Sequence, residues 1–191
     1  MNELVRFDDP PQRLKLTTHD YRILDDAGAF QGRPQVELVE GVILTVSPQQ
    51  NIHAIAKTEL ALRIAIKLKE LGLPHRAIVE GTLELSPNTA VNPDVTIASE
   101  RPTYTYMQPG NVALAIEIAN TSGAFDTGEK AALYAAGGVP EYWVLLLGKK
   151  RLIRYWIPGD NGYQHRDEVA LGEPFSSVTV PGLVTESVGL I

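Results

Sequence analysis

The sequence contains no cysteine. This absence excludes a disulfide framework, thiol-based catalysis and cysteine-ligated zinc. It also fits a location where disulfides are rare. The first residues, MNELVRFDDPPQ, lack a basic segment followed by an apolar one, so we expect no secretory signal peptide. We therefore expect a cytoplasmic protein.

Long apolar runs and an excess of basic residues are also missing. No apolar stretch approaches the roughly 20 residues needed to span a bilayer, so we expect no membrane partner. The chain has 17 Lys and Arg against 23 Asp and Glu, giving a formal net charge of −6. Proteins that coat nucleic acid are normally basic, because much of their binding comes from neutralising phosphates. The charge therefore argues against tight general nucleic-acid binding, but it allows an enzyme that contacts nucleic acid locally.

The composition suits one compact domain. The 191 residues are 44% hydrophobic, which is enough to build a sizeable core. Residues 1–16, with their Pro-Pro pair and mixed charge, are predicted to form a loose leader. We expect residues 17–191 to form a single domain.

Hydrophobic periodicity predicts a mixed α/β fold. Apolar residues alternate on either side of Glu40-Gly41, which predicts a β-hairpin. A long helix is predicted from Gln49 to Leu71, because Gly72 and Pro74 follow a run of good helix formers. Further helices are predicted over 17–28 and 125–138, and strands over 76–85, 91–98, 112–119, 141–147 and 151–157. This order predicts a sheet covered by two main helices.

Two carboxylates stand out against this pattern. Glu117 interrupts an apolar strand, although a buried carboxylate without a partner is costly. Asp94 stands at the mouth of the preceding predicted strand, so both side chains can point to one side and share a hard cation. Mg²⁺ prefers oxygen ligands, usually one or two carboxylates, with water and substrate phosphate completing the shell. The backbone carbonyl of Ile118 is a possible third ligand. Lys130, about one turn into the next helix, could orient or activate a water or stabilise charge on phosphate.

Each of these residues also has a plainer interpretation. An Asp after Pro is often a turn former. Glu117 could form a structural ion pair with Lys130, and Lys130 could be a solvated helix residue. The residues alone leave these alternatives open.

Three further residues could join such a site. Glu37 and Glu40 flank the predicted hairpin and could reach a cation from the opposite sheet edge, although both could simply be solvated. His53, early in the long helix, could contact phosphate or carry a proton, or could be a polar residue on the helix face. There is no His-x-x-x-His pair, no phosphate-binding glycine loop and no serine nucleophile elbow.

A series of segments resembles a known family. The segments ELVEGVIL, SPQQNIH, NPDVTIA, AIEIANTS, DTGEKAALYAAGGVPEYWVLL and RLIRYW occur in this order, from about Tyr21 to Trp156. Together they resemble the Uma-type family of "putative restriction endonucleases", part of the PD-(D/E)xK nuclease-like superfamily. The resemblance implies a restriction-endonuclease-like core, in which a central mixed β-sheet is flanked by helices. It also implies hydrolysis of DNA phosphodiester bonds that depends on Mg²⁺ or Mn²⁺.

The resemblance also implies roles for single residues. Asp94 matches the Asp of the Pro-Asp motif, and Glu117 matches the second acidic ligand. The superfamily normally has a lysine two residues after that acid, where this chain has Ala119. The resemblance implies that Uma-type sequences supply this lysine from the next helix, here as Lys130. Glu37 and His53 match the family's first-hairpin Glu and the His that opens its long helix.

The chain departs from the family pattern at two places. Val42 stands where the family usually has a Glu after the hairpin glycine, so one site acid of the family pattern is missing, for which Glu40 could substitute. Residues 120–122 read Asn-Thr-Ser, whereas the family commonly has Ser-Pro-Ser.

The sequence therefore supports two main hypotheses and one weaker one. The first is a metal-dependent endonuclease acting on DNA. The second is a nuclease-like fold without turnover, acting as a binding or assembly module, which the negative charge and Val42 favour. The third, a carboxylate-pair hydrolase of sugars, predicts activity without metal. A homodimer is a further expectation, with its face at the aromatic residues Tyr142, Trp143, Tyr155 and Trp156; ordinary core packing is the alternative.

Overall fold

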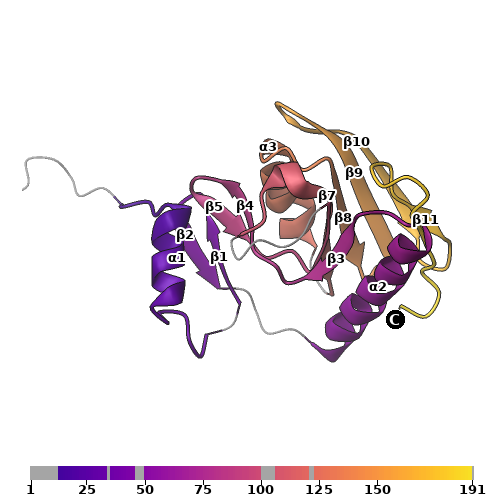
Figure 1. Cartoon of the computed structure of the whole chain (residues 1–191), viewed down its shortest axis with the longest axis horizontal. Coiled ribbons are helices and arrows are strands. Elements are labelled where there is room, and N and C mark those ends of the chain that lie inside the picture. Colours follow the sequence, from indigo (N-terminus) through magenta and orange to yellow (C-terminus); the bar gives the residue numbers. More distant parts are fainter. Residues whose placement is uncertain (1–12, 34, 46–49, 100–105, 121–122, 191) are drawn as a thin grey trace, which may run out of the picture.

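The computed structural model describes residues 13–33, 35–45, 50–99, 106–120 and 123–190 (Figure 1). Most of the predicted leader, residues 1–12, lies outside this part of the chain. Leu16 is already held in place, since its N–H donates to the carbonyl of Gly41 at 3.0 Å. That residues 17–191 form one domain stays a prediction. In the part described, no helix is both long and apolar enough to cross a membrane.

The larger of two main sheets has six strands. They are β3 (Arg76–Val79), β6 (Val95–Ala98), β7 (Val112–Ala119), β8 (Glu141–Leu146), β9 (Arg151–Gly159) and β10 (Gly162–Ala170). Their spatial order is β10-β9-β8-β7-β6-β3. The pair β7 and β8 is parallel, whereas the other neighbouring pairs are antiparallel. This central mixed sheet confirms the predicted fold class.

A smaller four-stranded sheet lies beside it, toward the N-terminal part of the chain (Figure 1). Its strands are β1 (Val36–Val39), β2 (Val42–Thr45), β4 (Leu83–Ser86) and β5 (Thr89–Val91), in the order β2-β1-β5-β4. The predicted hairpin is confirmed as β1-β2. Its turn residues, Glu40 and Gly41, have φ of 48° and 81°, as a tight two-residue turn with matching twist requires. Strands β11 (Phe175–Ser176) and β12 (Val184–Thr185) form a separate short pair.

The predicted strand over residues 76–85 is wrong in one respect, because it is two strands in two sheets. The chain turns at Glu80, whose φ of 54° is left-handed, and Gly81 follows it. The Glu80 N–H donates to the carbonyl of Asp94 at 3.3 Å, which closes the end of β3 against the start of β6. The break brings the side chain of Glu80 to the same end of the sheet as Asp94.

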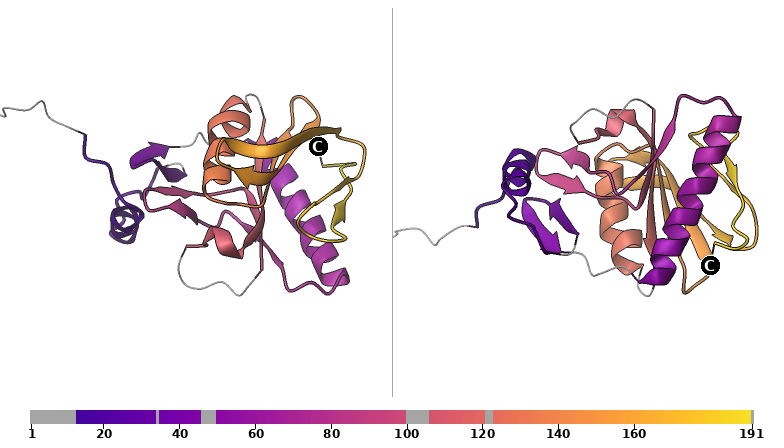
Figure 2. Two further views of the ribbon diagram at one scale, coloured as in Figure 1. Left: turned by 90° about the horizontal axis from the view of Figure 1, so that it is seen from above. Right: turned by 60° about the horizontal axis from the view of Figure 1, so that its bottom comes forward.

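Helices cover both faces of the six-stranded sheet (Figure 2). Helix α2 (Asn51–Glu70) covers one face and helix α3 (Ala131–Ala136) covers the other, with a π-helical turn η2 (Asp126–Lys130) leading into α3 and a short 3-10 turn η1 (Pro109–Asn111) before β7. Helix α1 (Thr18–Asp26) packs on the smaller sheet instead. Helix α2 packs with alternate residues of β7, including Ile116 and Ile118. Helix α3 packs with the residues between them, including Ala115 and Ala119. Side-chain alternation along β7 thus divides the core into two halves.

Helix α2 carries two apolar stripes. Its buried stripe, which contains Leu60, Ile64 and Leu68, spaced three or four residues apart, faces the sheet. Truncating a fully buried residue such as Leu60 to alanine would cost about 2–5 kcal/mol. The apolar residues Ile52, Ile55, Leu62 and Ile66 lie on the exposed side instead.

The dimer face predicted at the aromatic residues is wrong for three of the four residues, whereas Trp156 is partly exposed and stacks on the ring of His165. Tyr142 and Trp143 are fully buried, and Tyr155 is almost so. Their polar atoms bond within the chain: the hydroxyl of Tyr142 donates to the carbonyl of Asp126 at 3.0 Å, for example. Apolarity cannot by itself separate core from interface, and here it marks core. Dimerisation through another surface stays a prediction.

Candidate active site

A buried polar cluster lies between β7, the π-helical turn and the first hairpin. The ammonium of Lys130 is 2.9 Å from Glu117 Oε1 and 3.1 Å from Glu37 Oε1. The hydroxyl of Tyr134 donates to the same Glu117 oxygen at 2.8 Å. All four residues are at least 95% buried. The ion pair between Glu117 and Lys130, considered above as a structural alternative, is therefore present, and its surroundings decide what it can do.

Local structure explains how these groups meet. Glu117 shares the face of β7 with Ala115 and Ala119, whose small side chains leave room beside the carboxylate. Lys130 ends the π-helical turn, a wider turn that often occurs at functional sites. Tyr134 follows Lys130 by four residues and so lies on the same helix face. The chain therefore directs a cation and a hydroxyl donor onto one carboxylate.

Asp94 is held at the neighbouring strand by three groups. Its Oδ2 accepts the backbone N–H of Ile118 at 2.8 Å and lies 3.1 Å from His53 Nε2. Its Oδ1 is 3.5 Å from the ammonium of Lys57. Because Val95 pairs with Ile116, Asp94 stands opposite Glu117 at the end of the β6-β7 ladder. The structure therefore brings Asp94 and Glu117 onto adjoining positions of adjacent strands.

The carbonyl of Ile118 faces the same place. The next carbonyl, of Ala119, points toward β8, because it accepts the N–H of Leu147 at 2.8 Å. Backbone groups alternate sides along a strand, so the N–H and the carbonyl of Ile118 both point toward β6. The strand β6 begins only at Val95, so this carbonyl lies beside Asp94, past the end of the ladder.

The carboxylates change one another's ionisation. Burial raises the pKa of Glu117 to about 8; Lys130 opposes the rise, and Asp94 and Glu37 add to it. Burial also raises the pKa of Asp126, at the start of the same π-helical turn. For Lys130, burial acts to lower the pKa, but Glu117 and Glu37 outweigh it and the pKa rises. Lys130 therefore stays charged at neutral pH, whereas Glu117 is poised to lose a proton.

Sequence reasoning missed Lys57 and Glu80 as parts of this cluster. Lys57 is 6% exposed and contacts both Asp94 and Glu80. One signal was available: Lys57 follows His53 by four residues, so the two share a helix face. No comparable signal marked Glu80, because its position depends on the left-handed turn that ends β3.

Glu40 lies apart from the cluster. Its side chain is exposed at the hairpin turn, and its backbone N–H donates to the hydroxyl of Thr89 at 3.1 Å. Glu37, two residues into β1 and 1% exposed, is the hairpin glutamate that reaches Lys130. Val42 is 48% exposed, so the carboxylate that the family pattern would place there is not one of the buried ones.

The donor set suits a hard cation with an incomplete protein shell. In the described residues, no three His, Asp or Glu side chains form a ready-made metal cluster. The available oxygen ligands are the carboxylates of Asp94 and Glu117 and the carbonyl of Ile118. Mg²⁺ accepts such a partial set and completes its shell with water and phosphate. Both donors to Glu117 reach Oε1, and no described residue donates to its Oε2. That oxygen is available to a cation, so the residues present fit a divalent metal ion.

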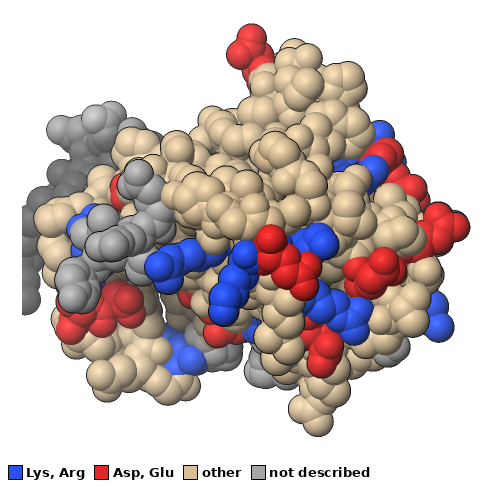
Figure 3. Space-filling model, turned by 45° about the vertical axis from the view of Figure 1, so that its right-hand side comes forward, with Lys and Arg blue, Asp and Glu red and all other residues tan. Residues whose placement is uncertain are grey.

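The face of the molecule shown in Figure 3 does not form a broad basic platform. On the face shown in Figure 3, lysine and arginine side chains lie among acidic ones. This mixture agrees with the net charge of −6. Any nucleic-acid contact on this face must therefore rely on a few well-placed cations.

Comparison with known proteins identifies the fold and the family of this chain. No curated protein matches this sequence. Among solved structures, the chain is similar to a "putative nuclease belonging to DUF820 from Anabaena variabilis ATCC 29413", with a TM-score of 0.63 and 15% sequence identity. The match covers 79% of this chain and 87% of that one, and at this identity it shows a shared fold. The model of the Uma2 family, described as "Putative restriction endonuclease", matches residues 19–187. Because this match spans most of the chain, the protein belongs to the Uma2 family.

Proposed function

We propose that this protein is a metal-dependent endonuclease that hydrolyses phosphodiester bonds in DNA. One observation carries the proposal: Asp94, Glu117 and the carbonyl of Ile118 adjoin one another at the end of the β6-β7 ladder, with the Lys130 ammonium on Glu117. Family membership supports the reaction class. Mg²⁺ or Mn²⁺ is the metal that this oxygen-only donor set favours.

Asp94, Glu117 and the Ile118 carbonyl would hold the metal ion. A divalent ion bound there would lower the pKa of a bound water and stabilise negative charge on the phosphate. His53 and Lys57 contact the Asp94 carboxylate and fix its orientation. Tyr134 does the same for Glu117. These contacts would preorganise the acidic pair before substrate arrives.

Lys130 would act as a charged donor. Its raised pKa keeps the ammonium protonated at neutral pH, so it cannot take a proton from water. It can orient a water or stabilise charge that develops on a phosphate oxygen. Glu37 holds Lys130 from the hairpin side at 3.1 Å and would keep the ammonium in place during the reaction. Of the predicted roles of Lys130, orienting a water and stabilising charge on phosphate therefore remain, and activation of water by proton abstraction is dropped.

The bond changes are those of hydrolysis. Oxygen of a water would add to phosphorus while the ester bond to one deoxyribose oxygen breaks. One proton leaves the attacking water and one reaches the departing oxygen. The products are a phosphate monoester and a hydroxyl group, with no oxidant or second substrate.

Cleavage of supercoiled DNA tests the proposal. We expect wild-type protein to nick it in Mg²⁺ or Mn²⁺, not in EDTA, and the Asp94→Asn variant to lose at least about 100-fold of that rate. The matched control is Glu70→Gln, because Glu70 is exposed on α2 and pairs only with Lys67 among the described residues. Equal metal-dependent cleavage by wild type and Asp94→Asn would contradict the assignment.

The second hypothesis, a nuclease-like binding module without turnover, rests on the acidic net charge. It predicts a folded wild-type protein that neither binds Mn²⁺ nor cleaves DNA. Intact thermal unfolding together with no calorimetric Mn²⁺ signal would favour this function over the nuclease.

A further inference from the structure

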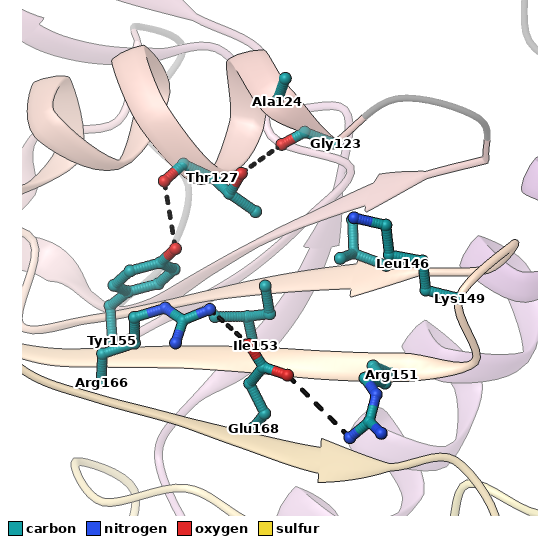
Figure 4. A pocket seen from close by; sticks show the side chains of 10 residues that line it. All are labelled: Gly123, Ala124, Thr127, Leu146, Lys149, Arg151, Ile153, Tyr155, Arg166 and Glu168. Atoms are coloured by element: carbon teal, nitrogen blue, oxygen red, sulfur yellow. Dashed lines mark hydrogen bonds and ion pairs between the residues drawn. The ribbon is translucent and has the colours of Figure 1, made fainter.

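A cavity of about 690 Å³ lies outside the acidic cluster (Figure 4). It opens on the α3 side of the six-stranded sheet, over β9 and β10. Three cationic side chains line it, Lys149, Arg151 and Arg166, together with one carboxylate, Glu168. Three positive charges against one negative leave this cavity with a net charge of +2, in a chain whose net charge is −6.

Strand periodicity builds this cavity. Arg151, Ile153 and Tyr155 alternate along β9 and therefore share one face of the sheet. Arg166 and Glu168 share the same face of the neighbouring strand β10, and Lys149 joins them from the turn before β9 (Figure 4). The cations thus come from three consecutive segments and meet over an apolar and aromatic floor.

Glu168 already lies between the two arginines. Its Oε1 is 2.5 Å from Arg166 Nη2, and its Oε2 is 4.0 Å from Arg151 Nη1. The side chains of both arginines are about half exposed, at 53% and 49%. Exposed ion pairs contribute little to stability, so a stronger anion could displace the Glu168 carboxylate at little cost. Among the described residues, Lys149 has no ion-pair partner.

The cavity adjoins the candidate active site through the π-helical turn. Thr127 lines the cavity, and its carbonyl accepts the hydroxyl of Tyr155 at 3.1 Å. Lys130 follows Thr127 by three residues, so both belong to the same turn. Tyr142 stacks between Tyr155 and Tyr134, with ring centroids 5.9 Å and 4.4 Å apart. One short helical segment therefore separates the basic cavity from Glu117.

We propose that this cavity binds a phosphate group of the nucleic-acid strand that flanks the bond cleaved at Glu117. Guanidinium groups match phosphate oxygens with paired hydrogen bonds, and Lys149 adds a mobile point charge. The cavity is open and lined by exposed cations, which suits a phosphate carried on a long polymer. The inference rests on the proposed nuclease function, which it extends from the reacting bond to the path of the strand.

DNA binding in EDTA tests this inference without involving the metal site. Fluorescence anisotropy of a labelled DNA duplex would give Kd at several salt concentrations for wild type and the double variant Lys149→Ala, Arg151→Ala. We expect Kd to rise at least about 10-fold and the slope of log K against log salt to fall by about 1–2, since each phosphate contact contributes about one. A Glu168→Gln variant should bind several-fold more tightly, because the competing carboxylate is gone.

A matched double variant, Arg33→Ala with Lys67→Ala, removes two cations outside the cavity, the exposed Arg33 and the partly exposed Lys67. Thermal unfolding of every variant checks the fold. The inference is overturned if wild type binds no DNA at low salt, if both double variants weaken binding equally, or if Glu168→Gln does not strengthen it. Competition with inorganic phosphate is a further test. If 10 mM phosphate releases the DNA more than a chloride control of equal ionic strength does, the cavity is a site for small anions, and its assignment to a DNA strand is overturned.

These outcomes separate the cavity from the proposed function. Weaker binding by the cavity variant together with no metal-dependent cleavage supports the cavity and contradicts the nuclease. Metal-dependent cleavage by wild type, together with unchanged DNA binding by the cavity variant, supports the nuclease and contradicts the phosphate site in the cavity.

Discussion

Two buried glutamates on adjacent strands show how differently one side chain can be used. Glu117 lies in β7 and Glu141 begins the parallel strand β8. Their exposed fractions are 5% and 0%, so burial does not distinguish them. Their hydrogen-bond partners do.

Glu141 is held by five neutral donor groups. They are the indole N–H of Trp143 at 2.7 Å, the hydroxyl of Ser177 at 2.6 Å, the N–H of Val178 and the N–H of Thr179 at 2.9 Å each, and the Thr179 hydroxyl at 2.8 Å. Both carboxylate oxygens are used. This carboxylate joins the C-terminal segment to β8, and its lone pairs are occupied by the fold.

Glu117 has donors on one oxygen and negative neighbours around it. Lys130 and Tyr134 both reach Oε1, while Asp94 and Glu37 raise its pKa. Even with Lys130 beside it, ionising this buried carboxylate among negative neighbours is costly, and a divalent cation would offset that cost. The comparison shows that burial does not mark the candidate site. What marks it is a pair of carboxylates, Asp94 and Glu117, in which one oxygen of Glu117 has no hydrogen-bond donor among the described residues.

The largest expected effect separates the two glutamates by activity. Glu117→Gln should lower the rate of metal-dependent DNA cleavage by about 10³-fold or more, because a metal ligand is lost. The fold should remain, since the amide still accepts from Lys130 and Tyr134. Steady-state cleavage and circular dichroism would measure both. A variant with near wild-type turnover would remove Glu117 from the site.

The second prediction separates them by stability. Glu141→Gln should lower the free energy of unfolding by about 3 kcal/mol, because an amide group cannot accept from all five donors and leaves some of them buried without partners. Urea unfolding measures this loss. Unchanged stability would show that the comparison between the two residues is wrong.

The third prediction concerns pH. With a pKa of about 8, Glu117 must lose a proton before it can bind a cation, so affinity for Mn²⁺ should rise about tenfold per pH unit below pH 8 and level off above it. In the metal-free protein the sign for stability is opposite. The folded pKa lies above the unfolded value of 4.5, so this contribution to stability is full below pH 4.5 and is lost as pH rises to 8. Glu117→Gln should abolish both dependences.

The smallest effect compares the two hairpin glutamates. Glu37→Gln weakens the hold on Lys130 and should lower the cleavage rate about 5–10-fold, roughly 1 kcal/mol. Glu40→Gln should change it by less than a factor of two, because Glu40 is exposed at the turn. Equal losses in both variants would indicate that the hairpin acts only through its fold.

The sequence could predict the features that depend only on residues close together in the chain. The Glu40-Gly41 turn and the carboxylate within the apolar strand over 112–119 are visible as departures from period two. The helix after that strand places Lys130 by its spacing. These elements follow from propensity and alternation, which act over a few neighbouring residues.

The remainder depends on tertiary geometry. Lys57 joins Asp94 only because α2 packs across the sheet, and Glu80 joins Lys57 only because of its left-handed turn. Tyr142 and Trp143 suggested an interface because an apolar strand looks the same whether a neighbouring element or a second chain covers it. The short strand β5 also depends on its pairing with β1, which is distant in the sequence, in addition to its local pairing with β4.

Calorimetric titration with Mn²⁺ at pH 8 tests the central claim most directly. We expect wild type and Glu141→Gln to bind Mn²⁺ at the same site with similar affinity, and Glu117→Gln to lose at least about tenfold. Absence of binding to folded wild-type protein, or equal binding by Glu117→Gln, would contradict a cation site between Asp94 and Glu117.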